Sequence, residues 1–255
     1  MMAPTAVALL SGSLDSLLAA RLIQVQGWLI RAIYHDTLCR PQRAQAESAA
    51  ASLGVPLEVL PPTPEFANLF RDPPHGFGRG SNPCLDCRLY MVRAAAEKMR
   101  QSSADLVVTG EVLGQHPMTQ KRRDLEHIAR ASGLEGRLLR PLSAQALLPT
   151  LAERAERVDR SKLAGIVGRG RRSQRLLASQ LAISLPAQRS SGCRVAEPAV
   201  SQRLAAWLAG EFTASGWCGG LLSMGLHHRV SARTMAILGR RLEENRQLEA
   251  AFTVA

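Results

Sequence analysis

Residues 6–23 read AVALLSGSLDSLLAARLI, and this stretch decides the fold. Residues 6–10 form a short apolar run, and apolar residues recur at helical spacing from Asp15 to Val25. A strand, a tight loop and a helix are therefore expected in this order. Backbone N–H groups of such a small-residue loop can approach an anion closely, and the helix dipole favours it. An ordinary helix N-cap at Ser13 or Asp15 is the structural alternative.

The same alternation continues along the chain. Further strands are predicted at residues 28–34, 56–60, 105–109 and 138–142, and helices at 41–53, 85–101, 123–132, 147–156, 160–168 and 175–183. Strands that alternate with helices in this way form parallel β-α-β units. The fold class is therefore α/β, with one parallel sheet.

Two segments depart from this alternation. Residues 61–83 are rich in proline and glycine and predict a mobile loop over the site. Beyond residue 185 a short helix and candidate strands at 221–224, 227–230 and 235–238 predict a small α+β domain. The chain is thus divided into domains at residues 1–185 and 186–255.

Composition restricts the partners and the compartment. The 255 residues carry a net charge of +11, nearly all of it from arginine. This excess favours a polyanionic partner, although a GC-rich genome would also enrich arginine. No apolar stretch is long enough to span a membrane, and the N-terminus does not resemble a signal peptide. Five cysteines in a leaderless chain indicate a reducing compartment, so a cytoplasmic location is expected.

The loop of residues 11–16, SGSLDS, resembles the SGGxDS motif of PP-loop ATP pyrophosphatases. The resemblance implies a Rossmann-like (HUP) sheet and cleavage of ATP between its α and β phosphates. It assigns ATP binding to Ser11, Gly12, Ser13, Leu14, Asp15 and Ser16, to Asp36 after the second strand, and to Thr109, Gly110 and Glu111 after the fourth. Ser13 stands where the family has glycine, and a serine would be strained there if φ were positive.

Two carboxylates are candidates for Mg²⁺, which travels with ATP. Asp15 can cap the helix or help to hold the ion, and Glu111 can bind it or lie on the surface. Arg140, which precedes a proline, either faces a phosphate or is exposed to solvent.

Cys84 and Cys87 form a C-x-x-C motif at a predicted helix N-terminus, where the dipole lowers thiol pKa values. Such a pair can be a redox pair or half of a zinc site. With the distant Cys193 it can also hold an iron–sulfur cluster. Cys39 and Cys218 have no partner spacing and are interpreted as buried small residues.

Five ordered blocks extend the resemblance over nearly the whole chain, at residues 82–87, 109–120, 139–144, 168–171 and 192–193. Together they resemble tRNA thiouridine synthases, the tRNA 2-thiouridylate or thiamine-biosynthesis-like PP-loop proteins. The resemblance implies catalytic roles for Asp15, Cys84, Cys87 and Cys193. It also implies that the three cysteines are metal ligands of a [4Fe-4S] cluster, with a cysteine persulfide as the alternative sulfur carrier.

Arginine clusters indicate contacts with RNA. Arg122, Arg123, Arg169, Arg171 and Arg172 are predicted contacts, although a charge run is often only a solvated face. Residues 224–229 and 238–245 resemble a small RNA-binding domain of the NFACT type, which adds Arg229, Arg240 and Arg241. The adjacent His227 and His228 would point to opposite faces of a strand and are not predicted to bind metal.

The leading hypothesis is ATP-dependent tRNA thiolation, with ATP and Mg²⁺ and with sulfur from a donor protein or sulfide. A PP-loop enzyme with a small-molecule substrate, such as an amidotransferase or a ligase, is the first alternative. A non-catalytic RNA-binding protein with a degenerate nucleotide site is the second, and Ser13 is its main support.

Overall fold

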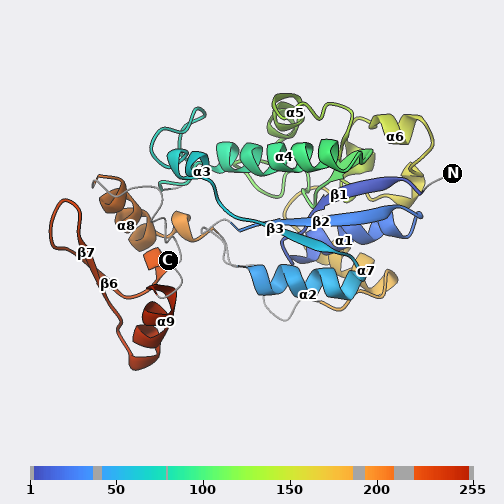
Figure 1. The fold of residues 1–255 in the computed structure, drawn as a ribbon. Helices are drawn as coiled ribbons and strands as arrows, with labels where there is room; N and C mark the ends of the chain where they lie inside the picture. The colour runs from blue at the N-terminus through green and yellow to red at the C-terminus, as the bar shows by residue number, and fades with distance from the viewer. Residues whose placement is uncertain (1–2, 37–41, 79, 186–192, 210–220, 253–255) are drawn as a thin grey trace. The chain divides into compact units, whose positions relative to one another are not determined.

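The computed structural model describes residues 3–36, 42–78, 80–185, 193–209 and 221–252, and Figure 1 shows the ribbon. The described chain divides into two compact units. The first contains residues up to 36, 42–61 and from 87 onward to 185; the second contains 62–86 and the residues from 193. The predicted boundary near residue 185 assigns residues 62–86 to the N-terminal domain, whereas they pack with the C-terminal residues.

The first unit is built on a five-stranded sheet. Its strands are β1 (Thr5–Leu9), β2 (Leu29–His35), β3 (Leu57–Leu60), β4 (Leu106–Val108) and β5 (Leu138–Leu139). All neighbours are parallel and the order is β3-β2-β1-β4-β5. The predicted α/β class is confirmed. The chain leaves the central β1 toward β2 on one side and returns to β4 on the other, so the switch point of the sheet lies between β1 and β4.

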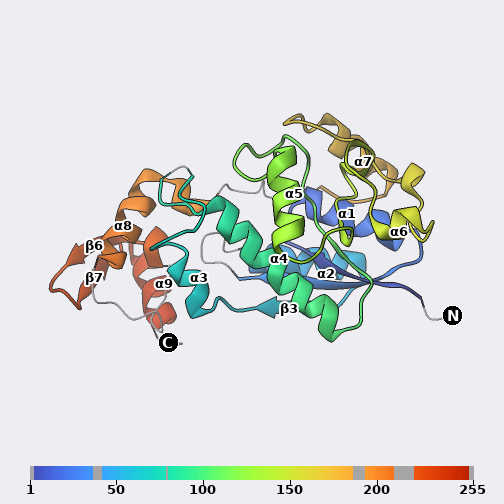
Figure 2. The same cartoon turned by 90° about the horizontal axis from the view of Figure 1, so that it is seen from above.

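Helices cover both faces of this sheet. Figures 1 and 2 show α4 (Cys84–Gln101) and α5 (Arg122–Ala131) on one face. On the other face are α1 (Leu14–Gln24), α2 (Arg43–Leu53) and α7 (Arg172–Gln180). Helices on both faces are the usual arrangement around a parallel sheet.

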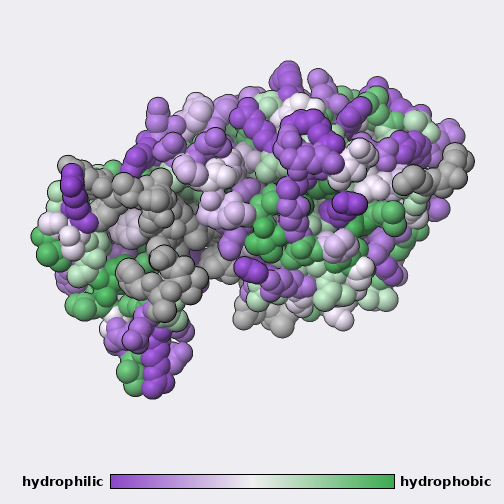
Figure 3. Space-filling model, in the orientation of Figure 1, coloured by the Kyte–Doolittle hydropathy of each residue, from purple (hydrophilic) through white to green (hydrophobic). Residues whose placement is uncertain are grey.

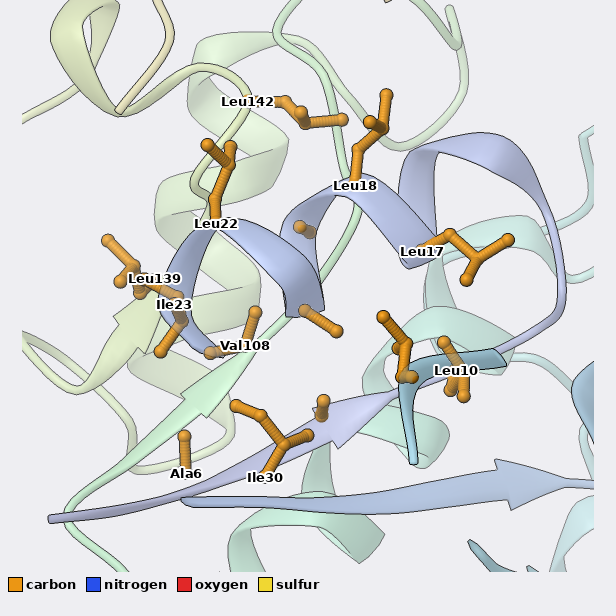
Figure 4. Packing of buried hydrophobic residues seen from close by; sticks show 14 of the residues in the cluster. Ala6, Leu10, Leu17, Leu18, Leu22, Ile23, Ile30, Val108, Leu139 and Leu142 are labelled. Atoms are coloured by element: carbon orange, nitrogen blue, oxygen red, sulfur yellow. The ribbon is translucent and has the colours of Figure 1, made fainter. Parts of the chain in front are cut away.

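The core lies between α1 and the strands. In Figure 4 the α1 side chain Ile23 points toward Val108 of β4, whereas Leu22 points away from the strands, to the side where Leu142 lies. Each of these four side chains is at least 95% buried. Full burial of such a side chain contributes about 1.5–3 kcal/mol. This packing fixes the N-terminal end of α1 at the sheet edge where β1 ends.

Two predicted helices of the first unit are shorter than their sequence pattern indicates. The helix expected at 147–156 is α6 (Leu151–Arg154), which begins at a capping box formed by Thr150 and Glu153. The helix expected at 160–168 is a single 3₁₀ turn, Arg160–Lys162. Residues 164 and 166 instead donate their N–H groups to the carbonyl oxygens of Pro141 and Leu142, at 2.9 and 2.8 Å. These backbone bonds hold the segment extended and prevent a helix.

The second unit contains α3 (Pro64–Asn68), α8 (Pro198–Leu208), the antiparallel pair β6 (Leu226–Arg229) and β7 (Met235–Leu238), and α9 (Leu242–Phe252). The helix α3 lies within the predicted loop of residues 61–83. The strand expected at 221–224 is a 3₁₀ turn, Leu221–Ser223, whose two leucines are both buried. Within the described residues, no helix combines the length and the apolar character needed to cross a membrane.

Candidate active site

The turn between β1 and α1 has the backbone of an anion-binding loop. Gly12 has φ +76°, and a Cβ there would lie 2.4 Å from the carbonyl carbon of Gln45. Only glycine fits this position. Ser13 has φ −72° and ψ 153° and is the N-cap of α1. A serine is therefore unstrained where the PP-loop motif has glycine, and the strain considered from the sequence is absent.

Three hydroxyl groups gather on this turn. Ser11 Oγ lies 2.9 Å from Ser13 Oγ, and Ser16 Oγ donates to the carbonyl oxygen of Ser13 at 2.9 Å. Ser16 Oγ also accepts from Ser11 N at 3.3 Å. Hydroxyl hydrogens rotate freely, so these groups can turn their donors to an arriving phosphate.

Asp15 is in the first turn of α1, and its residue is only 6% exposed. Its two carboxylate oxygens accept hydrogen bonds from Arg171 Nη1 at 2.6 and 2.5 Å. Gln115 Nε2 donates to Oδ2 at 2.8 Å, and Gln174 Nε2 donates to Gln115 Oε1 at 3.0 Å. The helix cap is Ser13, so Asp15 does not have the capping role considered from the sequence. Arg171, which was predicted as an RNA contact, thus lies beside the turn of residues 11–16.

The end of β4 meets the same turn. A Cβ on Gly110 would lie 2.6 Å from both the carbonyl carbon of Asp15 and the backbone nitrogen of Ser16. Thr109 is buried directly after the strand. The position of Thr109 and Gly110 beside the loop follows from the parallel pairing of β1 with β4.

Glu111 is the centre of a buried ion cluster. Its Oε2 accepts from Arg140 Nε at 2.9 Å and from Thr109 Oγ1 at 3.0 Å, and its Oε1 lies 3.3 Å from Arg88 Nε. Burial alone would raise the pKa of Glu111, but Arg140 and Arg88 together with the hydrogen bonds hold it below its ordinary value. Glu111 is therefore a buried counter-charge, and the surface carboxylate considered from the sequence is wrong.

Arg140 is buried as well, so the solvent-exposed position considered from the sequence is wrong. Its residue is 6% exposed, and its Nη2 donates to the carbonyl oxygen of Leu125 at 3.0 Å. Arg88 is a site residue that sequence analysis missed. Its position directly after Cys87 does not indicate this role, because its pairing with Glu111 depends on tertiary packing.

The end of β2 brings two titratable groups to the same edge. Asp36 donates its N–H to the carbonyl oxygen of Leu60 at 2.9 Å, and burial raises the pKa of its carboxyl group while Arg43 lowers it. His35 is buried, its ring lies 4.9 Å from that of Tyr90, and burial lowers its pKa to about 4. Its Nδ1 makes no hydrogen bond within the described residues. His35 was not singled out from the sequence.

The cysteines are placed as follows. Cys84 begins α4, Cys87 follows one turn later, and Cys193 precedes the 3₁₀ turn Arg194–Ala196; all three are partly buried. Among the described residues, no three His, Cys, Asp or Glu side chains come close enough together to hold a metal ion. The [4Fe-4S] ligand set that the resemblance implies stays a prediction. The predictions for Cys39 and Cys218 lie outside the described residues.

Most of the predicted RNA-contacting arginines are exposed. In the first unit these are Arg122, Arg123, Arg169 and Arg172. Figure 3 shows mainly hydrophilic residues over α4 and α5. In the second unit Arg229 and Arg241 are exposed.

Arg240 has a structural role in the turn between β7 and α9. Its Nη2 donates to the carbonyl oxygen of Gly225 at 3.1 Å, and Glu244 accepts from the backbone nitrogens of Gly225 and Arg240 at 2.7 Å each. Asn245 Oδ1 accepts from Gly239 N at 2.8 Å. The residues 239–245 quoted for the NFACT resemblance therefore build this turn.

A sequence model of one known family, described as thiamine biosynthesis protein (ThiI), matches residues 2–146. Two solved structures are similar in shape at low identity. A predicted subunit of tRNA methyltransferase from Methanocaldococcus jannaschii is 15% identical with a TM-score of 0.44, over 70% of this chain and 75% of its own. A 4-thiouridine synthetase in complex with RNA and with bound ATP is 19% identical with a TM-score of 0.43, over 70% of this chain and 51% of its own. The chain thus spans about half the length of that synthetase. No curated protein matches the chain.

Proposed function

The chain belongs to the thiamine biosynthesis protein (ThiI) family, and on that premise we propose that it is an ATP-dependent tRNA sulfurtransferase. The observation that carries the proposal is the turn of residues 11–16 at the carboxyl edge of the sheet. Gly12 has a positive φ in this turn. The end of β4 can pack directly against the turn because Gly110 has no side chain. Both the turn and Gly110 lie inside the matched residues 2–146.

The proposed reaction has two steps. The carbonyl oxygen of a uridine attacks the α-phosphorus of ATP, pyrophosphate leaves, and the base is adenylated. Backbone N–H groups of the turn and the first turn of α1 stabilise the negative charge that develops on the phosphates. Sulfur then attacks the activated carbon, and AMP leaves.

The sulfur carrier in this proposal is a cysteine persulfide. Its terminal sulfur attacks the base, and the thiolate of a second cysteine then forms a disulfide with the carrier and releases the thiolated base. Cys84 and Cys87 are one helical turn apart, at a helix N-terminus that favours the thiolate. An external reductant must restore the two thiols. A donor protein that itself carries a persulfide transfers its outer sulfur to the carrier cysteine and is left with a thiol.

No step is assigned to a magnesium ion held by Asp15 or Glu111. Both carboxylates are buried and already paired with arginine, and this does not fit a hard cation that needs free carboxylate oxygens. Mg²⁺ that enters with ATP would be held by the phosphates and water. No step is assigned to an iron–sulfur cluster either.

tRNA is the proposed substrate because of the charge. The exposed Arg122, Arg123, Arg169 and Arg172 are suited to phosphate contacts, and the whole chain carries a charge of +11. The non-catalytic alternative is weakened because Ser13 is unstrained at φ −72°.

Release of pyrophosphate from ATP in the presence of bulk tRNA tests the proposal. The wild-type protein should release pyrophosphate only when tRNA is added, and Asp15→Ala should abolish the release. Glu126→Ala, at an exposed position of α5, is the control and should keep it. Release without tRNA would point to a small-molecule substrate, and no release from the wild type would refute the proposal.

A further inference from the structure

Arg171 is placed by the fold at the phosphate loop, although it belongs to an arginine-rich run that suggests RNA binding. We propose that Arg171 is a ligand of the nucleotide phosphates, held in position by Asp15. This inference deepens the proposed function and rests on it. It assigns Arg171 to ATP and leaves Arg169 and Arg172 as candidates for RNA.

The path of the chain explains how Arg171 reaches the loop. After β4, the backbone of Leu113 pairs with that of Val167 in a parallel bridge. Gly168 N donates to the carbonyl oxygen of Leu113 at 2.7 Å. The segment from 167 onward therefore runs beside the residues that follow Gly110, and these residues lie against the first turn of α1.

The number of N–H donors that Arg171 does not use favours a role in ligand binding over a purely structural one. Both hydrogen bonds to Asp15 come from Nη1 of Arg171. Guanidinium has five N–H donors, so Nε and Nη2 retain three, for which the described residues show no hydrogen bond. The Arg171 side chain is 43% exposed, whereas that of Asp15 is only 8% exposed. One edge of the guanidinium is thus fixed by a buried carboxylate, while the rest of it is accessible to solvent.

The anchor is itself held in place. Gln115 donates to Asp15 Oδ2, and Gln174, which is fully buried on α7, donates to Gln115. A carboxylate held from two sides fixes the direction of the arginine. A planar group with spare N–H donors fixed in this way suits bidentate recognition of phosphate. A lysine would preserve the charge pair with Asp15 but not the spare donors.

Binding of ATP and of adenosine, measured by calorimetry, tests the inference. Arg171→Ala should weaken ATP binding by about ten-fold or more, the loss expected for charge-assisted hydrogen bonds, and change adenosine binding by less than about two-fold. Arg171→Lys should melt at nearly the wild-type temperature but recover little of the lost ATP affinity. Arg175→Ala, which removes the same charge at an exposed position of α7, should bind ATP like the wild type.

Three outcomes would overturn the assignment. Equal losses of affinity for ATP and for adenosine, or full recovery of ATP affinity in Arg171→Lys, would mean that Arg171 only stabilises the local structure around Asp15. Unchanged ATP binding in Arg171→Ala together with weaker tRNA binding would make it an RNA contact. If the wild type bound no ATP, the proposed function and this inference would both fail, whereas the other results refute the inference alone.

Discussion

Asp15 and Glu111 show how single residues set the electrostatics of this site. Each is a buried carboxylate, and each is neutralised by arginine: Asp15 by Arg171, and Glu111 by Arg140 and Arg88. A buried charge is tolerated only when it is paired. The negative charge beside the turn of residues 11–16 is therefore largely cancelled, which suits the polyanionic nucleotide that we propose for this site.

Glu111→Gln tests the buried cluster. The substitution leaves Arg140 buried without its counter-charge, which costs about 3–5 kcal/mol for pairs of this kind. The free energy of unfolding in urea at neutral pH should fall by an amount in this range. Glu126→Gln, at an exposed position of α5, should change it by less than about 0.5 kcal/mol. Equal free energies of unfolding of the two variants would show that the buried ion cluster does not stabilise the fold in solution.

His35→Phe tests the burial of the histidine beside Asp36. Burial lowers the pKa of His35 from 6.5 to about 4, so between these pH values the unfolded chain binds a proton that the folded protein excludes. Stability should therefore fall as the pH decreases from 6.5 toward 4, by on the order of 3 kcal/mol from this group.

Phenylalanine keeps the ring contact with Tyr90 but does not titrate, so the His35→Phe variant should lose less stability over this pH range. Urea unfolding at pH 7 and pH 4.5 provides the measurement. The exposed His228→Phe is the control and should retain the wild-type pH dependence. An identical pH dependence in His35→Phe would contradict the burial of His35.

Some residues of the candidate site could be predicted from the sequence. The loop of residues 11–16 and Thr109–Gly110 could be predicted, because a motif and the ends of parallel strands locate them. Arg88, Gln174 and His35 could not, because each acquires its role from partners far away in the sequence. Arg171 was recognised as basic, but its partner Asp15 is 156 residues away.

At the scale of elements, the contact between β4 and α1 depends on a missing side chain. Gly110→Ala would place a methyl group 2.6 Å from the backbone of Asp15 and Ser16, where rigid atoms cannot yield easily. The variant should lose about 1–3 kcal/mol of stability and bind ATP more weakly. Gly170→Ala, which meets open space, should match the wild type in thermal melting. Normal melting and ATP binding of Gly110→Ala would show that β4 and α1 are not in this close contact.

The elements themselves were largely predictable where periodicity is strong. The bounds of β1, α1, β2 and α4 lie within two residues of the predicted ones. The spacing of apolar residues along the sequence shows which side of each element is buried, and so locates the element. The helix predicted at 160–168 failed because its N–H groups bond to Pro141 and Leu142. The strand predicted at 221–224 failed because an apolar run does not distinguish a buried turn from a strand.

At the scale of the whole molecule, the two units are interleaved in sequence. Residues 62–86 belong to the C-terminal unit, and Ser81 N and Oγ each lie 2.9 Å from Ser201 Oγ of α8. A local pattern cannot reveal this pairing across 120 residues. The division at residue 185 was predicted from the change in the pattern of helices and strands alone.

A chain truncated after residue 190 tests this interleaving by limited proteolysis. Loss of α8 removes the partners of residues 62–86, so new cleavage should appear there while the parallel sheet stays resistant. Ser201→Ala in the full chain should give a weaker form of the same pattern. Full protection of residues 62–86 in the truncated chain would contradict the division.

Hydrogen exchange with and without ATP and Mg²⁺ is the measurement that tests the central claim most directly. If the turn between β1 and α1 binds the phosphates, peptides that cover residues 9–17 and 109–116 should exchange more slowly with ATP, and those of α9 should not change. Unchanged exchange in residues 9–17 at saturating ATP would contradict the claim.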